Sequence, residues 1–173
     1  PKIEYITDLT VLNDIKERVA AFDYETTGIK PHAKGHRIIC CSIATSENHV
    51  LVFMMPTNPT ERKPFIDFLR NPLISKYAQN MKYEHTWSLV RLKTEVVNWE
   101  WDTMIASHIL DNRPDVTGLK FQTYVQFGVI DYDSEISPYL KSRSNDGNAL
   151  NRIEELVKLT GGKEKLMEYC AMD

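Results

Sequence analysis

The chain has few cysteines, no long apolar run and no signal peptide, and each absence excludes a class of protein. Its cysteines, Cys40, Cys41 and Cys170, show no C-x-x-C spacing. Cys40 and Cys41 are neighbours in a predicted strand and face opposite sides, so we expect no disulfide between them. No apolar run approaches the length of a membrane span, so we expect no membrane contact. Reduced, cytoplasmic surroundings fit best.

The chain also lacks an excess of basic charge. Its formal net charge is −3, with 21 Lys and Arg against 24 Asp and Glu. This is weak evidence against a nucleic-acid partner, because an enzyme that gathers carboxylates around metal ions can be acidic overall. Repeats, low-complexity tracts and interdomain linkers are absent from the 173 residues. We therefore expect residues 1–173 to form one domain with a single substantial core.

Hydrophobic periodicity predicts an α/β fold. Alternating apolar residues predict strands at 20–25, 37–45, 49–55 and 74–78. Helical spacing predicts helices at 8–18, 64–70, 82–93, 102–111, 118–127, 148–159 and 162–173. The short turn at residues 46–48 makes the second and third strands antiparallel. The expected architecture is a central mixed sheet of about five strands, one of them antiparallel, flanked by helices.

The most informative pattern is Asp23-x-Glu25, at the end of the first apolar strand, followed by Thr26, Thr27 and Gly28. Because side chains on a strand repeat with period two, both carboxylates point to one face. Two acids on one face repel each other and lose hydration, so they need cations or shifted pKa values. The pattern indicates a site for divalent metal ions.

Two further segments carry similar chemistry. In the segment 79–84, Gln79 and Asn80 follow a strand and Glu84 lies just inside the next helix. Near the end of the chain, Tyr169 and Asp173 are four residues apart, which places them on one face of a helix. Each segment alone is common; the three together, in this order and after the right elements, are not.

These three motifs resemble those of the 3′–5′ exonucleases with four acidic residues, and Y-x-x-x-D resembles their tyrosine subclass. The segments QNMKYE, WDTMIASHILDN and GLKFQTYVQFG are further similar, in order and spacing, to the proofreading domain of bacterial or phage family A DNA polymerases. The resemblance covers nearly the whole chain and implies a ribonuclease H-like fold. It also implies the cytoplasm of a bacterial or phage-infected cell, and a chain that is part of a larger polymerase.

The resemblance implies a role for each motif residue. Asp23 would bridge two Mg²⁺ or Mn²⁺ ions; Glu25 and Asp173 would complete the first metal site and Glu84 the second. Tyr169 would orient the attacking water. The remaining motif residues would bind a single-stranded DNA 3′ end: Thr26, Thr27, Gln79, Asn80 and Tyr83. For Tyr83 core packing is an equal alternative.

The family usually has Asp where this chain has Glu84. The extra methylene moves the carboxylate by about one bond length, and a misplacement near 1 Å can cost on the order of a hundredfold in rate. Three functions remain open: a proofreading exonuclease, a ribonuclease D-like enzyme that trims RNA, and a weakened module that only binds.

Overall fold

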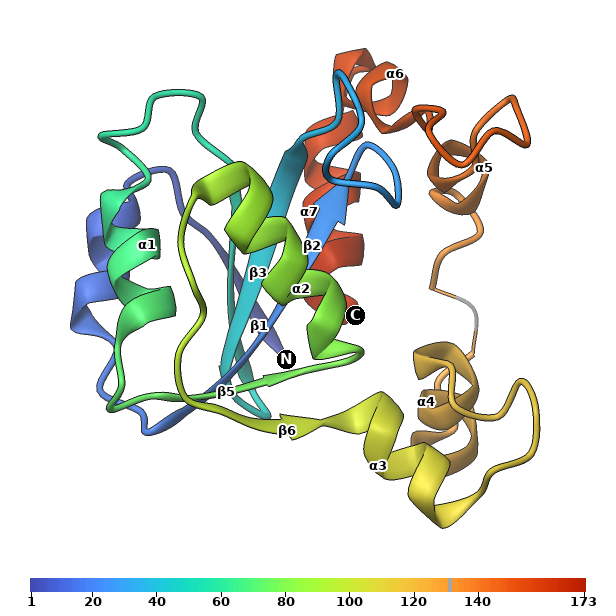
Figure 1. Ribbon diagram of the computed structural model, residues 1–173, viewed down its shortest axis with the longest axis horizontal. Coiled ribbons are helices and arrows are strands. Elements are labelled where there is room, and N and C mark those ends of the chain that lie inside the picture. Colours follow the sequence, from blue (N-terminus) through green and yellow to red (C-terminus); the bar gives the residue numbers. More distant parts are fainter. Residues whose placement is uncertain (131) are drawn as a thin grey trace.

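The computed structural model describes residues 1–130 and 132–173 and shows a six-stranded mixed sheet with helices on both faces (Figure 1). In sheet order the strands are β1 (Lys2–Tyr5), β4 (His49–Met54), β3 (Ile38–Ser46), β2 (Val19–Thr26), β5 (Ser75–Ala78) and β6 (Trp99–Asp102). Strand β3 is antiparallel to β2 and β4, and the other pairs are parallel. The expected mixed α/β architecture is confirmed.

The two edge strands were missed from the sequence. In β1 and β6 together, seven of the eight residues are exposed or partly exposed, and only Asp102 is buried. Because neither strand buries a regular face, neither shows the alternation from which the inner strands were predicted. The sheet therefore has six strands: the four whose ranges were predicted and these two, against the total of about five that we expected.

The helices are α1 (Lys63–Arg70), α2 (Met81–Trp87), α3 (Thr103–Leu110), α4 (Leu119–Phe127), α5 (Ser137–Leu140), α6 (Ile153–Lys158) and α7 (Gly162–Met172). The helix predicted at 8–18 is wrong, because only a 3-10 helix at Leu9–Asp14 forms there. The helix predicted at 148–159 begins only at Ile153. Before it, the backbone N–H of Asn151 donates to the Thr27 carbonyl, and its side chain donates to the Thr26 carbonyl, at 2.8 Å each.

The two faces of the sheet carry separate cores. Phe22 and Tyr24 of β2 pack with the 3-10 helix, α1 and Trp87. The other face packs against α6 and α7. Cys41 lies in the first core and Cys40 in the second, so the prediction that they face opposite sides is confirmed. All three cysteines are free.

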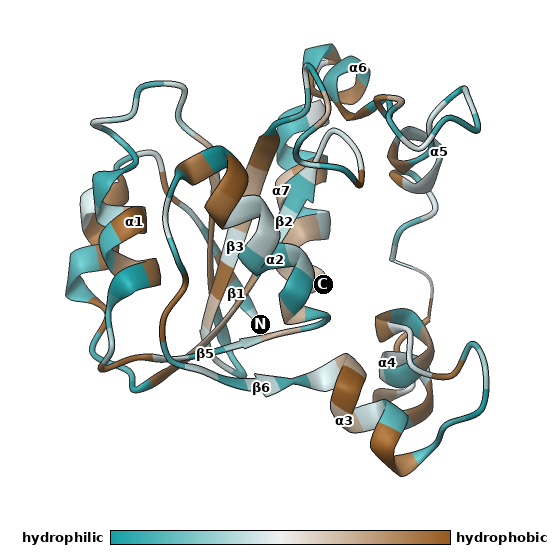
Figure 2. Ribbon diagram, viewed as in Figure 1, coloured by the Kyte–Doolittle hydropathy of each residue, from teal (hydrophilic) through white to brown (hydrophobic). Residues whose placement is uncertain are grey.

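Helices α3 and α4 lie beside this body and contain no buried residue (Figure 1). Figure 2 shows apolar segments on both. Ile109, Leu110 and Phe127 are each at least three-quarters exposed. Among the described residues, no helix has the length and apolarity needed to cross a membrane.

One buried carboxylate, Asp102 at the end of β6, fixes the start of two helices. Its Oδ1 accepts the N–H groups of Met104 and Ile105 and so caps α3. It also accepts the N–H of Asn80, at 3.0 Å, while its Oδ2 accepts that of Met81, at 2.9 Å. Asn80 adopts a left-handed conformation (φ 65°) immediately before α2. Asp102 thereby sets where α2 begins and where its side chains point.

We expect Asp102→Ala to destabilise the protein by about 2 kcal/mol, since a lost N-cap costs typically about 1 kcal/mol and two helix starts lose their acceptor. Urea unfolding followed by circular dichroism measures the change. The control is Asp8→Ala, which removes the acceptor for Thr10 alone. An effect of Asp102→Ala no larger than that of Asp8→Ala would contradict the shared cap.

Candidate functional site

Strand β2 brings two carboxylates together on the face that packs against α7. A carboxylate oxygen of Asp23, one of Glu25 and the Sγ of Cys170 all lie within 4.8 Å of one another. This confirms that the two acids share a face. The neighbouring Cys170 thiol donates to the Asp23 carbonyl at 3.8 Å, which ties α7 to the strand.

Helix α7 adds the third carboxylate, that of Asp173. The Tyr132 hydroxyl donates to Asp173 Oδ1 at 2.5 Å, and the Tyr169 hydroxyl also hydrogen-bonds this carboxylate. The two tyrosine rings are stacked with centroids 6.0 Å apart. Asp173 is therefore held in place by two phenols rather than free at the surface.

Helix α2 adds the fourth carboxylate from the opposite layer of the fold. Glu84 is only 1% exposed, and its Oε2 has no hydrogen-bond partner among the described residues. A buried carboxylate oxygen without a partner is costly unless it binds a cation or a proton. Burial first, and the charge of Asp23 second, raise the pKa of Glu84, so the two carboxylates interact electrostatically.

Burial raises the pKa of every acid in the site, and repulsion from a neighbouring acid of the site adds to this for Asp23, Glu25 and Glu84. Burial first, and Asp173 second, raise the pKa of Asp23 to about 8. Burial, followed by Asp23, raises that of Glu84 to about 9. The pKa of Glu25 lies well above its usual value for the same two reasons, and burial raises that of Asp173 despite its hydrogen bonds. An all-oxygen cluster with these properties suits hard divalent cations such as Mg²⁺ or Mn²⁺.

The predicted substrate residues divide into two groups. Thr26 and Tyr83 share a hydrogen bond of 2.5 Å between their hydroxyls. Tyr83 and Asn80 line a hollow of about 360 Å³, whereas Asp23 and Asp173 line a separate hollow of about 320 Å³. Side-chain groups of the other two are used within the fold: Thr27 Oγ1 accepts the Arg37 N–H at 2.8 Å, and Gln79 Nε2 donates to the Thr117 carbonyl at 2.9 Å.

Two residues near the acids were not singled out from the sequence. Tyr132 has no signal of its own, because it lies outside the three motifs. Lys120, in the quoted segment GLKFQTYVQFG, places its Nζ 5.3 Å from the centroid of the Tyr169 ring and forms an ion pair with Asp133. Its charge lowers the pKa of both Glu25 and Asp173, which partly offsets the repulsion.

Comparison with known proteins places this geometry in a family. The sequence model of a 3′–5′ exonuclease family matches residues 3–160 of this chain. The chain belongs to this 3′–5′ exonuclease family. The family inferred from the motifs is confirmed, although the matched range ends before Tyr169 and Asp173. A comparison with curated protein sequences found no match.

Solved structures share the fold of this exonuclease domain at low sequence identity. Brucella melitensis NrnC matches with a TM-score of 0.70 and 19% identity, covering 100% of this chain and 75% of that chain. Escherichia coli RNase D, an exoribonuclease involved in structured RNA processing, matches with a TM-score of 0.68 and 19% identity, covering 100% and 41%. The POL domain of Pol1 from M. smegmatis matches with a TM-score of 0.59 and 10% identity, covering 74% and 23%. These likenesses confirm a ribonuclease H-like α/β fold.

We expect the metal-free protein to lose stability as pH rises. The pKa values of Asp23 and Glu84, about 8 and about 9, lie above those of the unfolded chain, near 4. Between these limits the folded state binds more protons than the unfolded state, so the free energy of unfolding falls from about pH 4 to about pH 9. Thermal unfolding in EDTA across this range should show a falling Tm, with a smaller fall for Asp23→Asn. An equal fall of Tm with pH in the wild type and in Asp23→Asn would rule out Asp23 as a source of the lost stability.

We expect Tyr132→Phe to weaken metal binding by a few-fold, because Asp173 loses a hydrogen bond that favours its charged form. Titration with Mn²⁺ by isothermal calorimetry measures the affinity. Tyr139→Phe is the control, since Tyr139 packs in the same core. Unchanged Mn²⁺ affinity in Tyr132→Phe would show that this hydrogen bond does not prepare the site.

Proposed function

We propose that this exonuclease domain hydrolyses the terminal phosphodiester of single-stranded or frayed DNA 3′ ends with two Mg²⁺ or Mn²⁺ ions, releasing nucleoside 5′-monophosphates. The observation that carries the proposal is a set of four acids in which Asp23 and Glu25 lie within 4.8 Å of each other and Glu84 and Asp173 interact electrostatically with Asp23. They come from three elements: Asp23 and Glu25 from β2, Glu84 from α2, and Asp173 at the end of α7. The charge of Asp23 raises the pKa of Glu25 and Glu84, and Asp173 raises that of Asp23.

The four carboxylates would hold the metal ions. The family resemblance implies that Asp23 would bridge two ions, with Glu25 and Asp173 completing the first metal site and Glu84 the second. The unpartnered Oε2 of Glu84 is an observed acceptor available for such a cation or for its bound water. When bound, two metal ions lower the pKa of the attacking water and stabilise the charge on the attacking and leaving oxygens.

Tyr169 acts as a hydrogen-bond donor in this proposal. Burial raises its pKa above the usual value, and Asp173 and Glu25 raise it further. The hydroxyl therefore stays protonated near neutral pH and cannot serve as a general base. It can orient a water molecule beside Asp173, to which it is already hydrogen-bonded.

The hollow lined by Asn80 and Tyr83 would receive the end of the strand. Tyr83 is partly exposed there, and its hydroxyl is fixed by Thr26 and by the Gly28 carbonyl. A fixed aromatic ring offers a stacking surface for a base, worth roughly 1–3 kcal/mol. Trp87, by contrast, is 0% exposed and belongs to the core.

The preference for DNA rests on the similarity of three segments to the proofreading domain of family A DNA polymerases. That similarity supports DNA replication as the setting, with a polymerase domain as partner within a longer chain. RNA is the second candidate substrate. It is favoured by the likeness of the fold to RNase D and to NrnC, one structure of which has pGG bound.

Glu84 decides whether the site is fully active. Its electrostatic interaction with Asp23 and its unpartnered Oε2 support a role for this carboxylate in spite of the extra methylene. We therefore propose an active enzyme, with a weakened binding module as the alternative.

The decisive experiment incubates a labelled single-stranded DNA and an RNA of equal sequence with the protein and Mn²⁺. We expect stepwise shortening from the 3′ end, faster on DNA, and release of mononucleotides resolved on a denaturing gel. Asp23→Ala should lower the rate by at least a hundredfold, because the bridging carboxylate is lost. Tyr169→Phe should lower it on the order of a hundredfold.

Lys63→Ala, which removes the charge of an exposed side chain on α1, is the control and should cleave at the wild-type rate. Degradation of neither strand would leave only the binding module, and faster degradation of RNA would favour the ribonuclease D-like function.

A further inference from the structure

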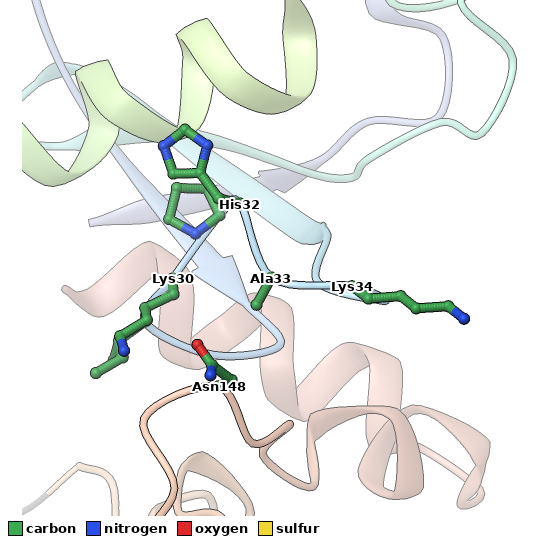
Figure 3. A pocket seen from close by; sticks show the side chains of 7 residues that line it. Lys30, His32, Ala33, Lys34 and Asn148 are labelled. Carbon is green, nitrogen blue, oxygen red and sulfur yellow. The ribbon is translucent and has the colours of Figure 1, made fainter.

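The loop between β2 and β3 forms a second hollow, of about 620 Å³, next to the one that contains Tyr83. Residues 29–34 of this loop line it together with Asn148. Figure 3 shows Lys30 and Asn148 close together on one side, Lys34 reaching outward on the other, and the His32 ring directed toward the helix above. Neither the three motifs nor the proposed chemistry uses these side chains.

The loop is held in one shape by the structure behind it. The buried His36 ring hydrogen-bonds the Asn148 carbonyl through Nε2 at 2.9 Å, and Arg91 Nη2 donates to the Ala33 carbonyl at 2.6 Å. A Cβ on Gly28 would meet the His36 ring at 2.2 Å, so the backbone passes directly over this histidine. The hollow is therefore a preformed feature of a fixed loop.

Positive charge gathers around this hollow although the chain as a whole is acidic. Lys30 and Lys34 line it, and Lys82 lines the neighbouring one. Within residues 1–130 and 132–173, none of these three lysines forms an ion pair, whereas Lys120, Arg143 and Lys165 all do. Lysines without a carboxylate partner leave their charge available to a polyanion.

The two hollows adjoin each other. Ile29, which is 69% exposed, and Pro31 line both. At the inner end, the Tyr83 hydroxyl bonds Thr26, the residue after Glu25. Ile29 therefore lies between the hollow that contains Tyr83 and the hollow that contains Lys30 and Lys34, and Tyr83 itself is bonded to the residue that follows Glu25.

We propose that this second hollow binds the sugar–phosphate backbone of the nucleic-acid strand on the 5′ side of its terminal dinucleotide. The inference rests on the proposed function, because that function places the 3′ end at the carboxylates. Lys30 and Lys34 neutralise phosphates there, while the exposed Ile29 contacts a sugar or a base. The subsite offsets the repulsion that an acidic site exerts on a polyanion, and it makes affinity increase with strand length.

The test compares the double variant Lys30→Gln/Lys34→Gln with the matched control Lys2→Gln/Lys16→Gln, whose two lysines are also exposed. Binding of a fluorescent single-stranded DNA decamer and of a dinucleotide is measured in EDTA, where the strand is not cleaved. We expect the double variant to bind the decamer about tenfold more weakly. The slope of log K against log salt concentration should become shallower by roughly 0.7 for each lost phosphate contact. Dinucleotide affinity should not change, and the control should bind both ligands as the wild type does.

An unchanged affinity for the decamer, or an equal loss for the dinucleotide and the decamer, would overturn the subsite. Unchanged thermal unfolding of the double variant excludes misfolding as the cause. Cleavage with Mn²⁺ is measured separately: if the wild type cleaves no strand, the proposed function fails, whereas the binding comparison still decides whether the loop holds nucleic acid. If cleavage occurs, kcat should be unchanged and KM for the decamer raised.

Discussion

Repulsion among carboxylates around Asp23 is the constraint on which the site depends. Three elements from both layers of the fold deliver negative charge to one point, and burial removes the water that would otherwise screen it. Without cations the acids retain protons at pH values where exposed carboxyls have lost them. The same arrangement that costs stability in the empty site gives a divalent ion its binding energy, so folding and metal binding are linked.

Hydrogen bonds from neighbouring phenols and one nearby cation limit this repulsion. Tyr132 and Tyr169 both bond Asp173 and favour its charged form, and Lys120 acts in the same direction on Glu25 and Asp173. The acids on β2 have fewer such partners. The site is therefore asymmetric: the α7 side is prepared for a negative charge, while the α2 side presents a carboxylate oxygen with no described partner.

The acids and the inner strands were predictable because they depend on local patterns. Asp23 and Glu25 share a face by strand periodicity alone, and the apolar runs of β2, β3 and β4 reflect burial on both faces. The edge strands β1 and β6 bury too little to show a pattern. Tyr132 and Lys120 reach the acids only through tertiary structure, since they lie 41 and 53 positions before Asp173 in the sequence. A helix was predicted at 102–111 and α3 does begin there, but the bonds of the Asp102 carboxylate to Asn80 and Met81 depend on the pairing of β5 with β6.

Helix α4 contains no buried residue, yet it carries Lys120. A helix with so little buried apolar surface opens at a much lower free energy than the sheet, and it can do so while the two cores stay intact. Each opening removes a positive charge from beside Glu25 and Asp173. The electrostatic balance of the most tightly packed part of the molecule is thus set partly by one of its least anchored segments, and amide exchange in α4 would report on it.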